Sequence, residues 1–103
     1  MHRAARLPLL LALACLAACS QTLDITPANA RKITVCVSEK KDVKQMFGEP
    51  NAVGLVGGMT IWTFVDDDET RRLMVAFAGG RAVDVALVPK ESAALVELKN
   101  RCR

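Results

Sequence analysis

The strongest strand patterns in the sequence are at Thr60 to Val65, TIWTFV, and at Arg72 to Val85, RLMVAFAGGRAVDV. β-Branched and aromatic residues fill the first stretch, with Trp62 and Phe64 on one side, as expected for a strand. In the second stretch, apolar residues alternate on both sides of Gly79-Gly80, a pair typical of a tight hairpin turn. The pattern therefore predicts a three-stranded antiparallel meander.

Two short helices are expected to cover this sheet. The segment 39–47 follows Ser38, a typical N-cap residue, and ends before Gly48, which can adopt the left-handed conformation at a helix C-terminus. Its apolar residues fall on one face: Val43, Met46 and Phe47. A second helix is expected after Pro89, because apolar residues recur there at helical spacing. The predicted fold class is α+β, a two-layer sandwich of a three-stranded antiparallel meander covered by two short helices.

Two segments have a composition that fits more than one structure. Residues 33–37 alternate in polarity, which is consistent with a short strand or with an extended lead-in to the first helix. Residues 52–58, AVGLVGG, combine apolar residues with three glycines. They are consistent with a loop or with a short edge strand that carries a bulge.

The first eighteen residues have the pattern of a secretory signal peptide. Arg3 and Arg6 make the start basic, an apolar run follows from Leu7 to Leu16, and small residues end the segment. The run is too short for a membrane-spanning helix, which needs roughly 20 apolar residues. Leu16-Ala17-Ala18-Cys19 resembles a bacterial lipobox, in which a peptidase cleaves before the cysteine and the thiol is acylated.

This pattern predicts a lipoprotein whose signal peptide covers residues 1–18. Cys19 would carry the acyl chains, and several chains on one residue anchor a protein stably in a membrane. Residues 19–32 are expected to form a flexible tether, and residues 33–103 a single domain. Ser20 favours the outer membrane, so we expect attachment to the periplasmic side of that membrane. The alternative is an ordinary signal peptide that happens to end in Ala-Ala-Cys.

Two further cysteines, Cys36 and Cys102, are expected to form a disulfide bond. An exported chain meets an oxidising compartment, and with Cys19 acylated only one intramolecular pairing remains. Closing so long a loop would restrict the unfolded chain by roughly 4 kcal/mol. The alternatives are two free buried thiols, or a Cys102 that pairs between molecules.

The composition argues against several classes of function. His2 is the only histidine and would leave with the signal peptide, and the chain has no tyrosine. The commonest general base and metal ligand would therefore be missing from the exported chain. Loss of Arg3 and Arg6 also lowers the net charge of +3 by two, which leaves no basic stripe for a nucleic acid. We expect no catalytic residue, no cofactor, no small-molecule substrate and no nucleic-acid partner.

Asp66 to Glu69 form the only candidate for a metal or enzyme site. Calcium loops place their ligands at alternate positions, with a glycine for the sharp turn. Four consecutive acidic residues after a strand lack this spacing. We therefore predict a solvated hairpin turn and no metal site.

Residues 40–51, KKDVKQMFGEPN, form a recognisable string with the two stretches quoted at the start. Over roughly residues 33 to 88, this string resembles the SmpA/OmlA (BamE-like) family of small outer-membrane lipoproteins. The matching motifs are the helix end Phe47-Gly48-Glu49-Pro50, the strand motif Trp62-Thr63-Phe64 and the glycine hairpin. The chain departs from the family pattern at Cys36, where members often have glycine, and at Phe64, which replaces a tyrosine.

The resemblance implies two helices before the sheet, whereas the residue pattern gives one before it and one after. It also implies a non-enzymatic accessory module that binds an envelope protein complex, such as the β-barrel assembly machinery. The alternative on the same fold is a periplasmic binding or inhibitory module, either an enzyme inhibitor or a secretion-system component.

Three residues are candidates for binding the partner. Trp62 is the first, because tryptophan is enriched at binding hot spots, although a lone tryptophan is more often part of the core. Leu55 and Val56 are the second choice, because they lie in the apolar, glycine-rich segment 52–58 and are expected to be exposed.

Overall fold

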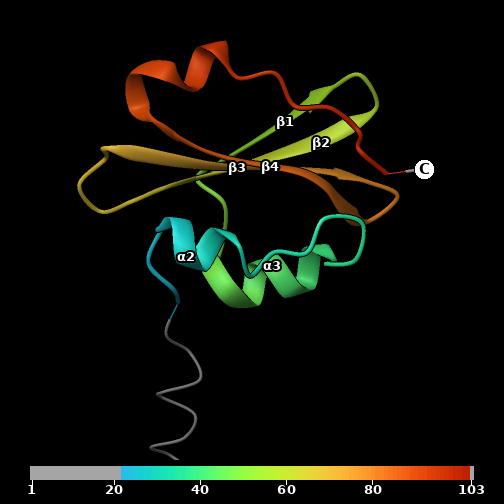
Figure 1. Cartoon of the computed structure of the whole chain (residues 1–103), viewed down its shortest axis with the longest axis horizontal. Coiled ribbons are helices and arrows are strands. Elements are labelled where there is room, and N and C mark those ends of the chain that lie inside the picture. Colours follow the sequence, from blue (N-terminus) through green and yellow to red (C-terminus); the bar gives the residue numbers. More distant parts are fainter. Residues whose placement is uncertain (1–21, 103) are drawn as a thin grey trace, which may run out of the picture.

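The sheet has four antiparallel strands in the order β1-β2-β3-β4, one more than the sequence predicts (Figure 1). The computed structural model describes residues 22–102. Its elements are α2 (Pro27–Ala30), α3 (Lys40–Phe47), β1 (Ala52–Val56), β2 (Met59–Val65), β3 (Arg71–Ala78), β4 (Arg81–Pro89) and the 3₁₀ helix η1 (Lys90–Leu95). The α+β class is confirmed.

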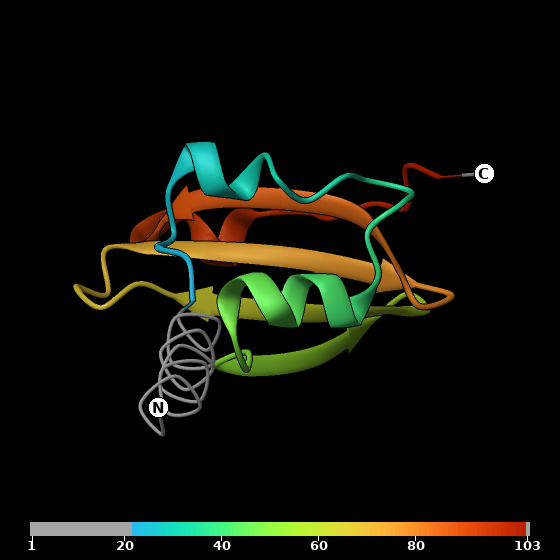
Figure 2. The same cartoon turned by 90° about the horizontal axis from the view of Figure 1, so that it is seen from below.

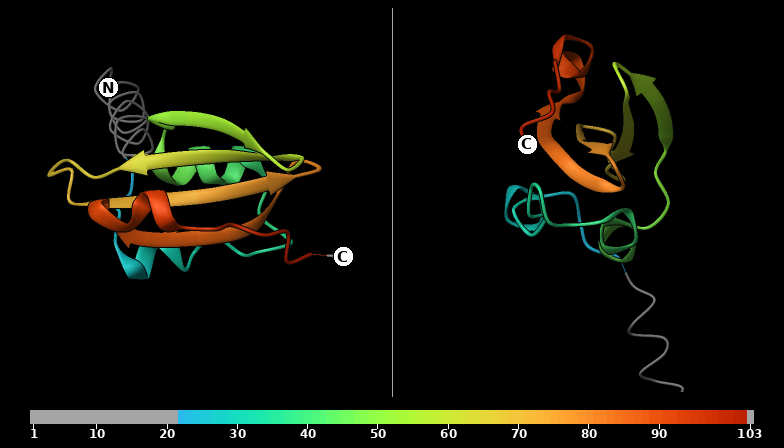
Figure 3. Two further views of the ribbon diagram at one scale, coloured as in Figure 1. Left: turned by 90° about the horizontal axis from the view of Figure 1, so that it is seen from above. Right: turned by 90° about the vertical axis from the view of Figure 1, so that its right-hand side faces the viewer.

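The two faces of the sheet are covered by different parts of the chain. Helices α2 and α3 lie on one face, here called the helix face, and Figure 2 looks onto this face with the two helices in front of the strands. The C-terminal segment, residues 90–102, lies on the opposite face, here called the C-terminal face (Figures 1 and 3). The larger core is between the helices and the sheet, and its largest fully buried side chains are those of Phe64, Phe77, Leu73, Val43 and Val75.

Residues 52–58, whose composition is consistent with a loop or with an edge strand, contain the edge strand β1. It pairs along its whole length with β2, from Ala52 opposite Thr63 to Val56 opposite Met59. The turn between them has two residues, Gly57 and Gly58, with φ of 55° and 81°. Positive φ at both positions suits a tight hairpin, and glycine adopts it without steric cost. The glycines therefore form a hairpin turn, and the residues before them form an edge strand.

The segment before α3 is folded, which corrects the expectation of a flexible tether over 19–32 for the part that the structure describes. Pro27 begins α2, and the Thr26 hydroxyl accepts a hydrogen bond from the Asn29 N–H at 3.1 Å. Ile25 and Ala30 are buried in the larger core. Isolated apolar residues can anchor a segment in a core without producing a periodic pattern in the sequence.

Helix α3 begins one residue later than predicted. Its N-cap is Glu39, whose N–H donates to the Asp42 carboxylate at 2.9 Å. Ser38 is not the cap; its hydroxyl accepts from the Thr34 N–H at 2.8 Å, within a turn that replaces the possible strand at 33–37. The predicted C-terminus is confirmed, because α3 ends at Phe47. Gly48 has a positive φ of 82°, as expected for a glycine there, but its ψ of −156° is outside the left-handed helical region.

The prediction of a helix after Pro89 is wrong. Only the short 3₁₀ helix η1 forms there, and the chain then runs without helical structure along the C-terminal face to Cys102. Hydrogen bonds to β4 hold this part, including one from the Arg101 N–H to the Val83 carbonyl at 3.2 Å. Leu98 and Cys102 pack on a second, smaller core cluster on this face. Tertiary contacts therefore override the helical spacing of the apolar residues.

Candidate protein-binding surface

The β4 edge of the sheet is closed by the chain segment that leads into α3. The Cys36 N–H donates to the Ala82 carbonyl at 2.7 Å, and the Ala82 N–H donates to the Ser38 carbonyl at 2.7 Å. A further bridge joins Glu39 and Arg81. The backbone groups at the start of β4 are therefore satisfied, and this part of the edge is not free to pair with another strand.

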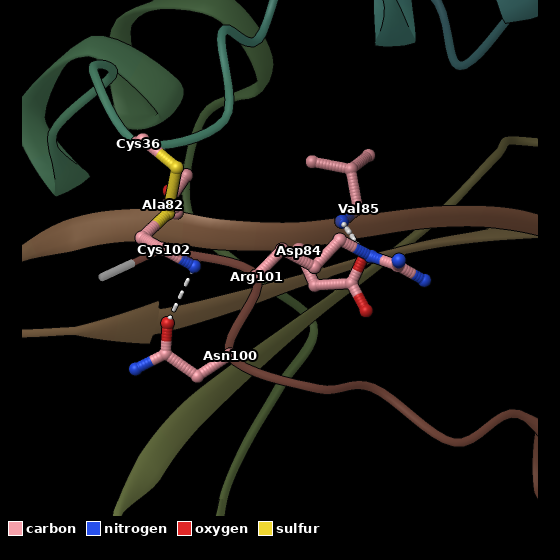
Figure 4. Close-up of a disulfide and its surroundings, with 7 residues drawn as sticks. All are labelled: Cys36, Ala82, Asp84, Val85, Asn100, Arg101 and Cys102. Atoms are coloured by element: carbon pink, nitrogen blue, oxygen red, sulfur yellow. Dashed lines mark hydrogen bonds and ion pairs between the residues drawn. A yellow bond between two sulfur atoms is a disulfide. The ribbon is translucent and has the colours of Figure 1, made fainter.

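A disulfide bond between Cys36 and Cys102 crosses the same edge beside Ala82 (Figure 4). It joins the helix-face segment to the end of the C-terminal segment, with the two Cα atoms 5.6 Å apart. The sequence prediction named this pair. The structure places Cys102 at the end of the non-helical C-terminal segment, and not on the helix expected after Pro89.

Asp84 is a structural residue that the sequence prediction missed. It lies on β4, is 5 % exposed and faces the C-terminal segment. Its carboxylate accepts a hydrogen bond from the Lys99 N–H at 2.9 Å. It also accepts one from Arg101 Nε at 2.7 Å, and Figure 4 shows these two side chains side by side. The signal in the sequence was an acidic residue inside an otherwise apolar strand. A β-bulge at Ala76/Phe77 shifts the register here and places Val83 on this face too, which the simple alternation did not predict.

The opposite edge, strand β1, is open. All five of its residues are exposed, and none of them is charged. Leu55 is 82 % exposed, Val53 is 61 % exposed and Val56 is 60 % exposed. Folded proteins usually protect an edge strand with charged residues, proline, a bulge or a covering segment. Within the described residues, the sheet therefore has one edge that is closed at the start of β4 and one unprotected apolar edge at β1.

The side chains of β1 alternate between the two faces of the sheet. Leu55 lies opposite Thr60, which in turn lies opposite the core residue Phe77, so Leu55 is on the helix face. Val56 lies opposite Met59, a member of the second core cluster, so Val56 is on the C-terminal face. The exposure expected for Leu55 and Val56 is confirmed, but they lie on a strand and point in opposite directions.

A groove of about 340 Å³ runs between β1 and the C-terminal segment. Figure 3 shows that this segment lies over the β4 side of the sheet and leaves the β1 side uncovered. The groove is lined mainly by apolar side chains and carries one acidic residue, Glu97. Its apolar lining includes Ala52, Val56, Ile61, Met74, Val96 and Leu98. A surface of this kind is suited to an apolar segment of another protein.

Trp62, the first candidate for partner binding, packs on the core of the helix face. Its ring centroid is 4.8 Å from that of Phe77 and 6.2 Å from that of Phe64, both with edge-on geometry. It is partly buried and lies opposite Val53 of β1. Most of its contacts are therefore structural, and Leu55 and Val56 are far more accessible.

The acidic turn 66–69 is closed by its own first residue. The Asp66 carboxylate accepts hydrogen bonds from the Thr70 N–H at 2.7 Å, the Thr70 hydroxyl at 2.9 Å and the Arg71 N–H at 3.2 Å. Burial opposes the charge on Asp66, but these hydrogen bonds outweigh it and lower the pKa of the carboxyl group. No cluster of three or more side chains suited to a metal ion occurs among residues 22–102.

The signal peptide 1–18 and the acylation site Cys19 lie outside the described residues. Within the part of the chain that the structure describes, no helix is both long and apolar enough to cross a membrane.

Comparison with protein-family models, with curated proteins and with solved structures finds no match.

Proposed function

We propose that the chain is a non-enzymatic lipoprotein, anchored through Cys19 to the periplasmic side of the outer membrane. There it acts as an accessory protein-binding module in envelope or β-barrel protein assembly. The observation that carries the protein-binding role is the open apolar groove on the C-terminal face. The membrane, the compartment and the process come from the lipobox and from the resemblance to the SmpA/OmlA family.

Two features of the fold agree with that resemblance. Helices α2 and α3 both precede the sheet, as the family pattern implies. Cys36 stands where family members often have glycine, and its φ is 74°, a left-handed conformation that glycine adopts most easily. The chain therefore has cysteine at position 36, but the backbone there has the conformation that suits glycine, the residue that family members often have.

The groove is suited to a protein partner because of what lines it and what surrounds it. Its wall on β1 consists of small and β-branched apolar residues, which can pack against an apolar side chain from another protein. The disulfide and Asp84 fix the C-terminal segment that forms the opposite wall. A groove held in this way loses little conformational entropy when a partner binds.

The test compares two matched variants in intact cells. Val56 lines the groove and is 60 % exposed, whereas Val37 is 64 % exposed and lies outside the groove, before α3. Crosslinking, affinity recovery of the tagged full chain and mass spectrometry would identify its partners. We expect Val56→Asp to reduce recovery of the partner at least tenfold, the effect of about 1.4 kcal/mol of binding free energy, and Val37→Asp to leave it unchanged.

The identity of the recovered proteins decides the process. Recovery of β-barrel assembly components would support the proposed function. Recovery of another envelope complex, or inhibition of a periplasmic enzyme by the purified chain, would favour the alternative binding or inhibitory role. Equal recovery with Val56→Asp and Val37→Asp would remove the groove as the binding surface.

A further inference from the structure

We infer that strand β1 pairs with β1 of a second copy of this chain. The two strands would run antiparallel about a two-fold axis beside residue 54, and the two sheets would become one continuous sheet. Alternate residues of an edge strand direct their N–H and C=O groups away from the sheet, where another strand can bond them. This inference goes beyond the proposed function, because it does not depend on the identity of the assembly partner.

The sequence of β1, AVGLV, matches itself in this register. On the helix face, Val53 of one copy would lie opposite Leu55 of the second copy, so that two highly exposed apolar side chains cover each other. On the C-terminal face, Ala52 would lie opposite Val56, which pairs a small side chain with a larger one. Directly opposite apolar pairs of this kind stabilise antiparallel sheets.

Gly54 would lie at the centre of the pairing, opposite Gly54 of the second copy. A Cβ atom built on Gly54 meets nothing within 4 Å, so the space around it is open. Glycine inside a strand often marks a place where another backbone approaches closely. Gly54 therefore leaves room for a second β1 strand, although glycine weakens β1 as a strand on its own.

Charge also favours the antiparallel arrangement. The acidic turn 66–69 lies at the end of the sheet where β1 begins, and its four acidic residues outnumber the neighbouring Arg71 and Arg72, of which Arg71 pairs with Asp66. At the opposite end, the β3–β4 turn and the start of α3 carry three basic residues, Lys40, Lys41 and Arg81, and two acidic residues, Glu39 and Asp42. Antiparallel pairing brings unlike ends of the two copies together, whereas parallel pairing would bring the two acidic turns together. Salt screens such exposed charges, so they favour an orientation more than they supply affinity.

The size of the contact predicts a reversible dimer. Stable complexes bury roughly 1,200–2,000 Å² in total. Pairing through one five-residue strand falls at or below the low end of that range. We therefore expect the fraction of dimer to depend on protein concentration.

The test uses the full chain in intact cells with one added cysteine. Opposite residues of an antiparallel pair have Cα atoms about 4.5–5.5 Å apart, within the separation of about 4.4–6.8 Å that a disulfide spans. We expect Gly54→Cys to form a reducible dimer on mild oxidation. Leu95→Cys is the control, because Leu95 is 84 % exposed, like Leu55, but lies on η1. Adding Leu55→Lys to Gly54→Cys should reduce the dimer to the level of that control, whereas adding Leu95→Lys should not.

The outcomes separate this inference from the proposed function. If Gly54→Cys gives no more dimer than Leu95→Cys, or if Leu55→Lys does not reduce it, the pairing of two copies is overturned. That result leaves recovery of an envelope complex through Val56 unaffected. Conversely, a dimer that depends on Leu55, with no recovered complex, would support the pairing while the proposed function fails.

Discussion

Asp84 on β4 accepts a hydrogen bond from Arg101 Nε at 2.7 Å, and this contact joins the sheet to the last residues of the chain. The two partners differ in burial, because the Asp84 side chain is 6 % exposed and the Arg101 side chain is 61 % exposed. The same carboxylate also accepts from the Lys99 N–H. Asp84 therefore holds the C-terminal segment through two hydrogen bonds, one from the Lys99 backbone and one from the Arg101 side chain.

The first prediction follows from this difference in burial. We expect Asp84→Ala to reduce the free energy of unfolding by about 1–3 kcal/mol, because it removes a buried acceptor from several donors. Arg101→Ala should cost no more than about 1 kcal/mol, since an exposed cation contributes little. Urea unfolding of the two purified variants measures both values. Equal losses would show that the ion pair, and not the backbone hydrogen bonds to Asp84, fixes the segment.

The second prediction concerns the left-handed conformation of Cys36. Replacing both Cys36 and Cys102 by serine should cost roughly 4 kcal/mol, because the bond closes a separation of 66 residues in the unfolded chain. Serine at position 36 also keeps the strain of a φ of 74°. Cys36→Gly combined with Cys102→Ser removes the same bond but relieves that strain, which is about 1–2 kcal/mol for a residue with a Cβ.

Unfolding of both double variants under the same conditions tests this prediction. We expect the variant with glycine to be the more stable of the two by about 1 kcal/mol, since glycine also loses more entropy on folding. The opposite order would mean that position 36 leaves the left-handed region once the disulfide is absent.

The third prediction is a pH dependence centred on Asp66. Its hydrogen bonds hold the folded-state pKa below that of the unfolded chain, so the ionised carboxylate stabilises the fold above its ordinary pKa. This contribution is lost as the pH falls through the lowered folded-state pKa. We therefore expect Asp66→Asn to melt at a lower temperature than the unmodified chain near pH 7, and the difference to shrink below about pH 4.

Asp68→Asn is the matched control for this measurement, because Asp68 belongs to the same turn and is exposed. Thermal unfolding across the pH range should show little change for Asp68→Asn at any pH. If the effect of Asp66→Asn did not depend on pH, Asp66 would stabilise the fold through the shape of the turn and not through its charge.

The sequence predicts those parts of the fold in which local pattern and tertiary contacts agree. This group contains strand β2, the hairpin of β3 and β4, helix α3 and the cysteine pair. The alternation and the turn residues indicate the same elements that the tertiary contacts stabilise, and an oxidising compartment favours the disulfide. The helix predicted after Pro89 does not form, because hydrogen bonds to Asp84 and from the Arg101 backbone, together with the disulfide, hold the chain extended. The local pattern could not show this, because the partners in these contacts are distant in the sequence.

The candidate site could be predicted only in part. An apolar, glycine-rich segment indicated that Leu55 and Val56 are exposed. The sequence could not show that they lie on an open edge strand, because this depends on β2 pairing on one side and nothing covering the other. It also could not show which of the two lines the groove, since the pairing register places their side chains on opposite faces.

The last prediction tests the folded segment before α3, where the sequence indicated a flexible tether. Ile25 is 8 % exposed in the larger core, and the Leu23 N–H donates to the Met46 carbonyl at 2.7 Å. Because Ile25 is part of this core, Ile25→Ala should reduce the free energy of unfolding by about 2–5 kcal/mol, as expected for a buried aliphatic side chain. Thr22→Ala, at an exposed position three residues earlier, should change it by less than about 0.5 kcal/mol. Equal and negligible effects would show that these residues belong to the tether, and that the larger core is complete without them.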